Sequence, residues 1–228
     1  ERLAEALCKA FGEKGAKAYF TAGGSEANET ALKLAWQYWQ AVGRSSKIKV
    51  ISRRDSYHGN TLGALSVSGS PARRTPVEAV LQDWPRIEPC YAYRYQQSDE
   101  TSEEYGVRAA LKLEEAIVSA GPDTVAAFIA EPIVGASLGA VAAAPGYFKK
   151  IREICDQYEV LLIADEIMCG TGRSGSFYAH TQEGVLPDIV TLAKGLGGGY
   201  QPLAATIARA HVVEAFDVKP FSHGHTYV

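Results

Sequence analysis

Three ionisable side chains stand directly after apolar runs in this sequence. Glu131 follows VAAFIA, Asp165 follows VLLIA, and Lys194 follows DIVTLA. A lysine amine held against apolar surroundings attacks carbonyl groups and forms Schiff bases. A buried carboxylate beside a heteroaromatic nitrogen keeps that nitrogen protonated, so that the ring can accept electrons. Together these side chains indicate a site for an aromatic aldehyde.

Other residues supply what such a ligand would need. Gly24 and Ser25 lie in a glycine turn that leads into a helical pattern, and the N-terminus of a helix binds phosphate. Ile167, two positions after Asp165, is expected to point the same way as Asp165 in an extended chain and to cover one face of the ring. Tyr57, in DSYHGN, is placed to stack on the other face. Phosphate, aldehyde and aromatic ring together describe pyridoxal 5'-phosphate (PLP).

The elements that must position these residues alternate between short apolar runs and longer segments of helical period. This alternation predicts an α/β fold with a mostly parallel sheet and flanking helices. In such a sheet, ligands bind beyond the carboxyl ends of the strands, where the reactive residues lie. The expected strands are residues 17–22, 47–52, 125–130, 160–164, 188–193 and 203–208. The expected helices include residues 25–43, with Ser25 as the N-cap, and residues 145–159.

The composition favours a soluble globular protein. The 228 residues are 46% hydrophobic and 21% charged, with a formal net charge of -3. No apolar run reaches the roughly 18 residues that a membrane span needs, and the mild acidity gives no attraction to nucleic acid. Four cysteines without a CxxC pair indicate neither a disulfide framework nor a structural zinc site. We expect a cytoplasmic protein, with a mitochondrial location as the alternative, and neither nucleic acid nor membrane as a partner.

The motifs also resemble, in chain order, those of class III aminotransferases, which belong to fold type I of the PLP-dependent transferases. The similar segments are FTAGGSEANETALKLA, SYHGNTLGALSVSG, AEPIVGASLGA, APGYFKKIREICDQYEVLLIADEIMCGTGRSGSFYA, PDIVTLAKGLGGGYQPLAA and HGHTY. The resemblance implies that residues 1–228 are the PLP-binding large domain, with the N-terminal segment and the C-terminal small domain of the family absent. It also implies a homodimer with shared active sites.

The resemblance assigns the central chemistry to two residues. Lys194 would hold PLP as the internal aldimine and carry the proton, and Asp165 would pair with the pyridinium nitrogen. Ile167 and Tyr57 would enclose the ring between them. The implied reaction is a ping-pong transamination, in which an amino acid or amine donates its amino group and a keto acid accepts it.

The same resemblance gives roles to the remaining candidates. Gly24 and Ser25 would bind the phosphate, and Thr226 in HGHTY would reach the phosphate of the partner subunit. Glu131 matches an acid that the family carries near the cofactor. His58 also matches, and it either supports the site or takes part in the chemistry.

Two departures from the family pattern bear on the substrate. Branches that act on ornithine or 4-aminobutyrate commonly carry a glutamate where this chain has Ala136, and often a glutamine where it has Met168. Both departures count against those substrates. Two alternative functions stay open: a PLP-dependent racemase, aminomutase or decarboxylase of the same family, and a truncated, non-catalytic relative.

Other patterns invite different interpretations. GTGRSG formally matches GxGxxG, but it does not open an amphipathic helix, so dinucleotide binding is not favoured. His223 and His225 form an HxH pair without an evident third ligand, so no metal site is predicted. The two arginine pairs, at residues 53–54 and 73–74, are expected to lie on solvated surface.

Overall fold

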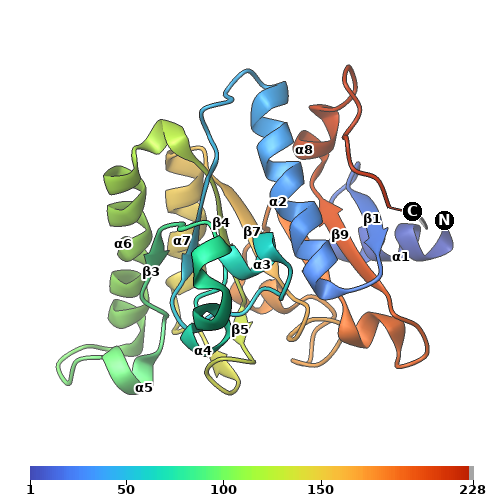
Figure 1. Ribbon diagram of the computed structural model, residues 1–228. Coiled ribbons are helices and arrows are strands. Elements are labelled where there is room, and N and C mark those ends of the chain that lie inside the picture. Colours follow the sequence, from blue (N-terminus) through green and yellow to red (C-terminus); the bar gives the residue numbers. More distant parts are fainter. Residues whose placement is uncertain (226–228) are drawn as a thin grey trace.

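A sheet of seven strands forms the centre of the fold in the computed structural model, which describes residues 1–225 (Figure 1). The strand order is β1-β9-β8-β7-β4-β2-β3. Strand β9 runs antiparallel to both of its neighbours, and the other pairs are parallel, so the predicted mostly parallel sheet is confirmed. The strands are β1 (Lys17–Thr21), β2 (Lys49–Arg53), β3 (Arg86–Ile87), β4 (Val125–Ala130), β7 (Leu161–Asp165), β8 (Ile189–Leu192) and β9 (Ala204–Ala208).

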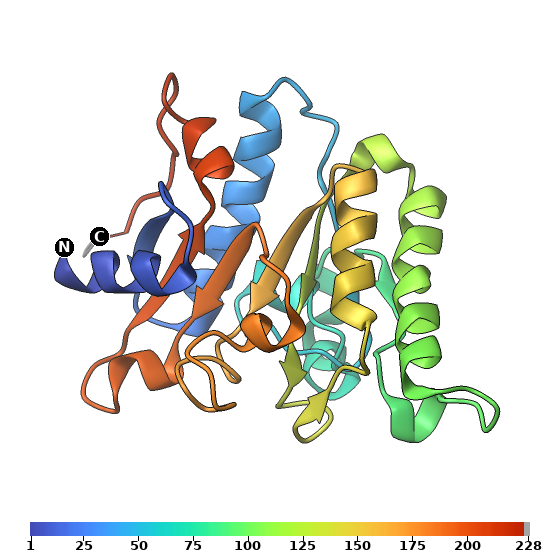
Figure 2. The same cartoon turned by 180° about the vertical axis from the view of Figure 1, so that it is seen from behind.

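Helices cover both faces of this sheet. Helix α2 crosses the face that is turned to the viewer in Figure 1, whereas α1, α6 and α7 lie on the opposite face (Figure 2). The long helices are α1 (Arg2–Phe11), α2 (Gly24–Ala41), α6 (Ser102–Ala120) and α7 (Tyr147–Gln157). The short ones are α3 (Leu62–Ser66), α4 (Pro71–Arg74), α5 (Ala92–Tyr95) and α8 (Ala210–Glu214). Short 3-10 helices are η1 (Thr75–Val80), η2 (Pro122–Thr124), η3 (Ala179–Glu183) and η4 (Lys194–Gly197).

Strand β4 illustrates why the apolar runs become central strands. All six of its residues are buried. Phe128 and Ala130 belong to the core that the sheet forms with α6 and α7, whereas Ala127 and Ile129 belong to the core under α2. Because successive side chains point to opposite faces, a strand covered on both sides has to be apolar throughout.

The excursion between β2 and α6 contains the short helices α3, α4 and α5 and the short strand β3. Short helical pieces are what its sequence predicts for residues 70–104, whereas β3 was not predicted. The excursion also corrects the expectation for the arginine pairs. Arg53 and Arg74 are only 1% and 5% exposed. Arg53 lies 5.9 Å from the ring centres of Tyr147 and Phe148 of α7, and Arg74 donates to backbone carbonyls at the end of α3. Residues distant in the sequence thus bury Arg53, whereas Arg74 is buried against the neighbouring helix α3.

A small antiparallel ribbon, β5 (Ile133–Val134) with β6 (Val141–Ala142), follows β4.

Helix α6 begins with a capping box, in which the side chains of Thr101 and Glu104 each accept from the other's backbone N–H. No helix of the described residues is long and apolar enough to cross a membrane.

Lys47 closes the edge of the sheet at which β2 and β4 begin. Its side chain is 1% exposed, and Nζ lies 4.6 Å from the ring centre of Trp39. Four backbone carbonyls accept from Nζ at 2.9–3.3 Å, those of Pro122, Val125, Tyr158 and Glu159. Lys47 therefore ties η2, β4 and the end of α7 together.

Replacing Lys47 with methionine is expected to lower the free energy of unfolding by about 2–4 kcal/mol, because the buried carbonyls lose their shared donor. Lys49→Met is the matched control, since Lys49 donates to the carbonyl of Ala120 alone, and it should cost less than about 1 kcal/mol.

Burial lowers the pKa of Lys47 from 10.5 to about 8. The unfolded chain thus binds more protons between these pH values, so stability from this site should rise with pH there. Urea denaturation at pH 7, 8 and 10 measures this pH dependence and the stability of the two variants. Equal losses of stability in Lys47→Met and Lys49→Met would contradict the expected role of Lys47.

Candidate active site

The candidate residues converge because the strands that precede them run in the same direction. Strands β1, β2, β4, β7 and β8 all end at the lower edge of the sheet in Figure 1. A cavity of about 300 Å³ opens at this edge, a size typical of small-molecule sites. Its walls include eight of the predicted residues: Gly24, Ser25, Tyr57, His58, Glu131, Asp165, Ile167 and Lys194. Thr226 lies outside the described residues.

Lys194 directly follows Ala193, the residue after β8, and begins the turn η4. Its backbone φ is 46°, a left-handed conformation that costs a non-glycine residue about 1–2 kcal/mol. The side chain lines the cavity and is exposed, so the expected apolar confinement of the amine is wrong for this chain. The reason is that β8 ends at Leu192, and the turn carries Lys194 out of the sheet to the mouth of the cavity.

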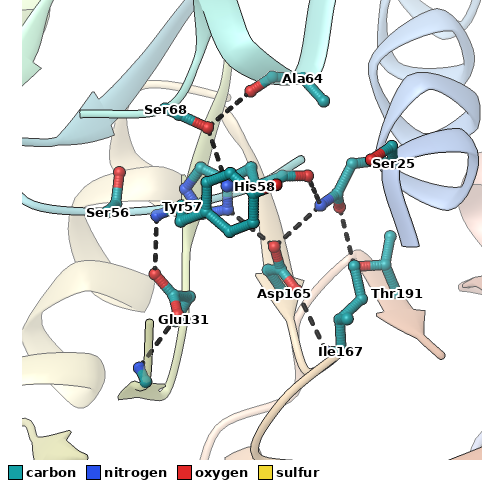
Figure 3. Close-up of polar contacts among 12 residues, drawn as sticks. Ser25, Ser56, Tyr57, His58, Ala64, Ser68, Glu131, Asp165, Ile167 and Thr191 are labelled. Carbon is teal, nitrogen blue, oxygen red and sulfur yellow. Dashed lines mark hydrogen bonds and ion pairs between the residues drawn. The ribbon is translucent and has the colours of Figure 1, made fainter. Parts of the chain in front are cut away.

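Asp165, the last residue of β7, is 3% exposed and accepts three hydrogen bonds (Figure 3). His58 Nδ1 lies 2.7 Å and Asn28 Nδ2 lies 2.8 Å from its Oδ2. The backbone N–H of Ile167 donates to its Oδ1 at 3.1 Å. A carboxylate offers about four acceptor positions, so one position remains on the oxygen bonded by Ile167. The three donors stabilise a negative charge on this carboxylate.

The contact between Ile167 and Asp165 corrects the expected geometry of Ile167. The chain does not continue extended after β7 but turns back on itself, so that the N–H of Ile167 meets the Asp165 carboxylate. The Ile167 side chain still lines the cavity and packs against Gly24 of α2. A Cβ at Gly24 would stand 2.9 Å from Ile167 Cδ1 and 3.0 Å from its Cγ2, so any larger residue there would force Ile167 to move.

Helix α2 starts at the cavity, and its N-cap is Gly23 rather than the predicted Ser25. Within the described chain, no side chain caps this helix end. The Ser25 hydroxyl instead accepts from the backbone N–H of Asn60 at 3.1 Å and lies 3.0 Å from Asn60 Oδ1. The first N–H groups of α2 therefore face the cavity without a side-chain partner, an arrangement that favours anions.

Glu131 and His58 complete the polar wall. Glu131 is 3% exposed and accepts from the backbone N–H groups of Tyr57 at 3.1 Å and Gly135 at 3.2 Å. Burial raises the pKa of the Glu131 carboxyl. His58 is 1% exposed, and its backbone N–H donates to Ser68 Oγ at 2.8 Å. The imidazole of His58 thus contacts the Asp165 carboxylate, and His58 also lines the cavity.

Tyr57 is half-buried and lines the cavity. The guanidinium of Arg73 lies 4.1 Å from the centre of the Tyr57 ring, but Arg73 does not line the cavity. The cation thus packs on one face of the ring.

The profile of the family described as "Aminotransferase class-III" matches residues 1–228. The chain belongs to the class III aminotransferases. An uncharacterized aminotransferase of Schizosaccharomyces pombe is 46% identical over 96% of this chain and 48% of its own length. A protein of Solanum lycopersicum named gamma aminobutyrate transaminase 3, chloroplastic, is 42% identical over 99% of this chain and 44% of its own length.

Solved structures of the family share the fold. The omega transaminase of Pseudomonas jessenii in complex with PMP superposes with a TM-score of 0.92 at 36% identity, covering 98% of this chain and 50% of that one. The chain thus spans about half the length of the class III aminotransferases that it matches.

The sequence analysis did not identify two buried polar residues that are connected by hydrogen bonds to Asp165. Asn28 is fully buried in α2, and Thr191 is fully buried in β8. The signal for Asn28 was available, since it lies four positions before Leu32 on the apolar stripe of the helix. A polar residue on a buried stripe requires hydrogen-bond partners. Ala136 and Met168, the departures from other class III branches, both line the cavity.

The two other patterns in the sequence have simpler structural explanations. The GTGRSG segment forms a turn in which the backbone N–H of Thr171 donates to Phe177. His223 Nε2 lies 2.9 Å from Thr30 Oγ1, and its ring stacks on Phe221. Within residues 1–225, no group of three or more His, Cys, Asp or Glu side chains is arranged to hold a metal ion.

Proposed function

We propose that the protein containing this chain is a PLP-dependent transaminase, which moves an amino group from an amino acid or amine to a keto acid by a ping-pong mechanism. Residues 1–228 would be its PLP-binding large domain. One observation carries the proposal: the amine of Lys194, the carboxylate of Asp165 and the N-terminus of α2 open into one cavity. These three groups suit an aldehyde, a pyridine nitrogen and a phosphate respectively.

The cavity wall fits PLP in further respects. The acceptor position that remains on Asp165 suits a ring N–H, and the uncapped end of α2 suits the phosphate. The close packing of Gly24 on Ile167 leaves an apolar surface beside Asp165, suitable for one ring face. Tyr57 lines the same cavity and would cover the other face.

Each residue would have a defined task in the reaction. Bound PLP supplies an electron sink that weakens the Cα–H bond of the amine substrate. Lys194 would hold the cofactor through Nζ and, once released from it, carry the substrate proton as general base and then general acid. Asp165 would hold the ring nitrogen, and His58 would orient Asp165. Glu131 would keep the peptide of Tyr57 in place through its Oε1.

The substrate, the assembly and the location remain parts of this proposal. Ala136 and Met168 give the cavity an apolar wall and argue against ornithine and 4-aminobutyrate as donors, although several relatives in Solanum lycopersicum are named for gamma aminobutyrate. We propose a homodimer, in which Thr226 reaches the phosphate of the partner subunit. A cytoplasmic location stays a prediction, because the relatives include proteins named as chloroplastic and mitochondrial.

Borohydride reduction of the full-length protein with PLP should attach the cofactor to Lys194, as peptide mass spectrometry would show. Attachment elsewhere, or none, would contradict the proposal. A single turnover with an amine donor should then yield a keto product and the amine form of the cofactor. An inverted or CO₂-losing product would instead favour a racemase or decarboxylase, and an inert full-length protein would favour a non-catalytic relative.

A further inference from the structure

The buried side chain of Asn28 forms three hydrogen bonds within the candidate site. Its Nδ2 donates to the backbone carbonyl of His58 at 2.6 Å and to Asp165 Oδ2 at 2.8 Å. Its Oδ1 accepts from Thr191 Oγ1 at 2.9 Å. An amide carries two N–H donors, and both are used. The alternative orientation of the amide would place its oxygen against two acceptors, so the chemistry of the neighbours determines how Asn28 points.

Through these bonds Asn28 joins the three parts of the candidate site. It lies one turn into α2, the helix whose first residues Gly24 and Ser25 line the cavity. It contacts Asp165 at the end of β7 and Thr191, three residues before Lys194, on β8. The side chain of Asn28 therefore connects the N-terminal part of α2, the Asp165 carboxylate and strand β8, which leads to Lys194.

We infer that Asn28 is a positioning residue for the cofactor ring: it holds the Asp165 carboxylate in the orientation that meets the ring nitrogen. The inference rests on the proposed function. Asn28 and His58 both donate to Oδ2 of Asp165, which leaves the open acceptor position on the other oxygen. Without the amide, only His58 and the N–H of Ile167 would restrain rotation of the carboxylate about its χ2 bond, which is a broad torsion.

The substitution Asn28→Asp tests this role with almost no change in shape. A protonated carboxyl has a single O–H, so it cannot donate to both the His58 carbonyl and Asp165. An ionised one would place a second negative charge beside Asp165, and two such carboxyls share a proton. The shared proton lowers the negative charge that Asp165 presents to a ring nitrogen.

We expect Asn28→Asp to weaken PLP binding by the full-length protein about 10-fold or more. We also expect it to raise, by about one unit, the pH midpoint of the absorbance of bound PLP. The shift is upward because the ring nitrogen would then carry less positive charge. It would therefore repel less strongly the proton on the nitrogen that joins PLP to Lys194. A purely structural role for Asn28 would lower thermal stability without moving this midpoint.

Two companion variants make the result decisive. Thr191→Val removes only the bond to Asn28 Oδ1 and should shift both quantities in the same direction, with binding about threefold weaker. Gln40→Glu adds the same charge at the exposed far end of α2 and should bind PLP within about twofold of the unsubstituted protein. Circular dichroism of each variant reports folding. If Asn28→Asp does not fold, Thr191→Val decides alone.

Spectral midpoints and PLP dissociation constants that match Gln40→Glu in both other variants would overturn the inference. If the unsubstituted full-length protein binds no PLP, the proposed function fails first, and the inference fails with it. The two failures are thus distinguished by the unsubstituted protein alone.

Discussion

Replacing Lys194 with alanine is expected to lower kcat of the full-length protein by at least about 10³-fold, because the reaction loses its proton carrier. The amine stands at the mouth of the cavity and forms no ion pair within residues 1–225. Initial rates with an amine donor and a keto acid measure the loss. Lys112→Ala, on the exposed surface of α6, is the control and should change kcat by less than about twofold.

The backbone at Lys194 allows activity and folding to be separated. The φ of 46° strains alanine as it strains lysine, but not glycine. Lys194→Gly should therefore be about 1 kcal/mol more stable than Lys194→Ala and equally inactive. Denaturation curves of the two variants test this difference. Turnover within tenfold of the unsubstituted protein, in either variant, would remove Lys194 from the mechanism.

The strands and the location of the site could be predicted because both follow from local sequence. An apolar run such as residues 125–130 has few alternatives to a central strand, and the predicted bounds match β4. Glu131, Asp165 and Lys194 each follow such a run, and parallel strands end at one edge of the sheet. The positions of the predicted strands in the sequence therefore already imply that these three residues share one cavity.

The details that could not be predicted depend on contacts between distant parts of the chain. Arg53 was expected in solvent, and only the packing of α7, about a hundred residues later, buries it. Ile167 reaches the cavity through a turn that the Asp165 carboxylate stabilises, which strand alternation does not describe. The hydrogen-bond partners of Asn28 lie 30, 137 and 163 positions away.

Asp165→Asn is expected to lower kcat of the full-length protein about 10²- to 10³-fold and to cost about 1–3 kcal/mol of stability. Two donors, from His58 and Asn28, meet Oδ2, so the amide oxygen of the variant should take that position. Its NH₂ group would then stand at the Oδ1 position, where it faces the N–H of Ile167 and offers no acceptor to a ring nitrogen. The variant thus keeps its shape and loses the charge.

The neighbouring acid supplies a matched control for Asp165. Glu166 is 0% exposed and accepts from the backbone N–H groups of Ala179 at 2.6 Å and His180 at 2.7 Å, but it does not line the cavity. Glu166→Gln should cost about 1–3 kcal/mol of stability, because an amide nitrogen would face a donor. Its kcat should fall far less than that of Asp165→Asn. Thermal denaturation and steady-state rates on both variants measure this contrast, and equal losses of kcat would mean that burial, not contact with the cofactor, explains the effect of Asp165.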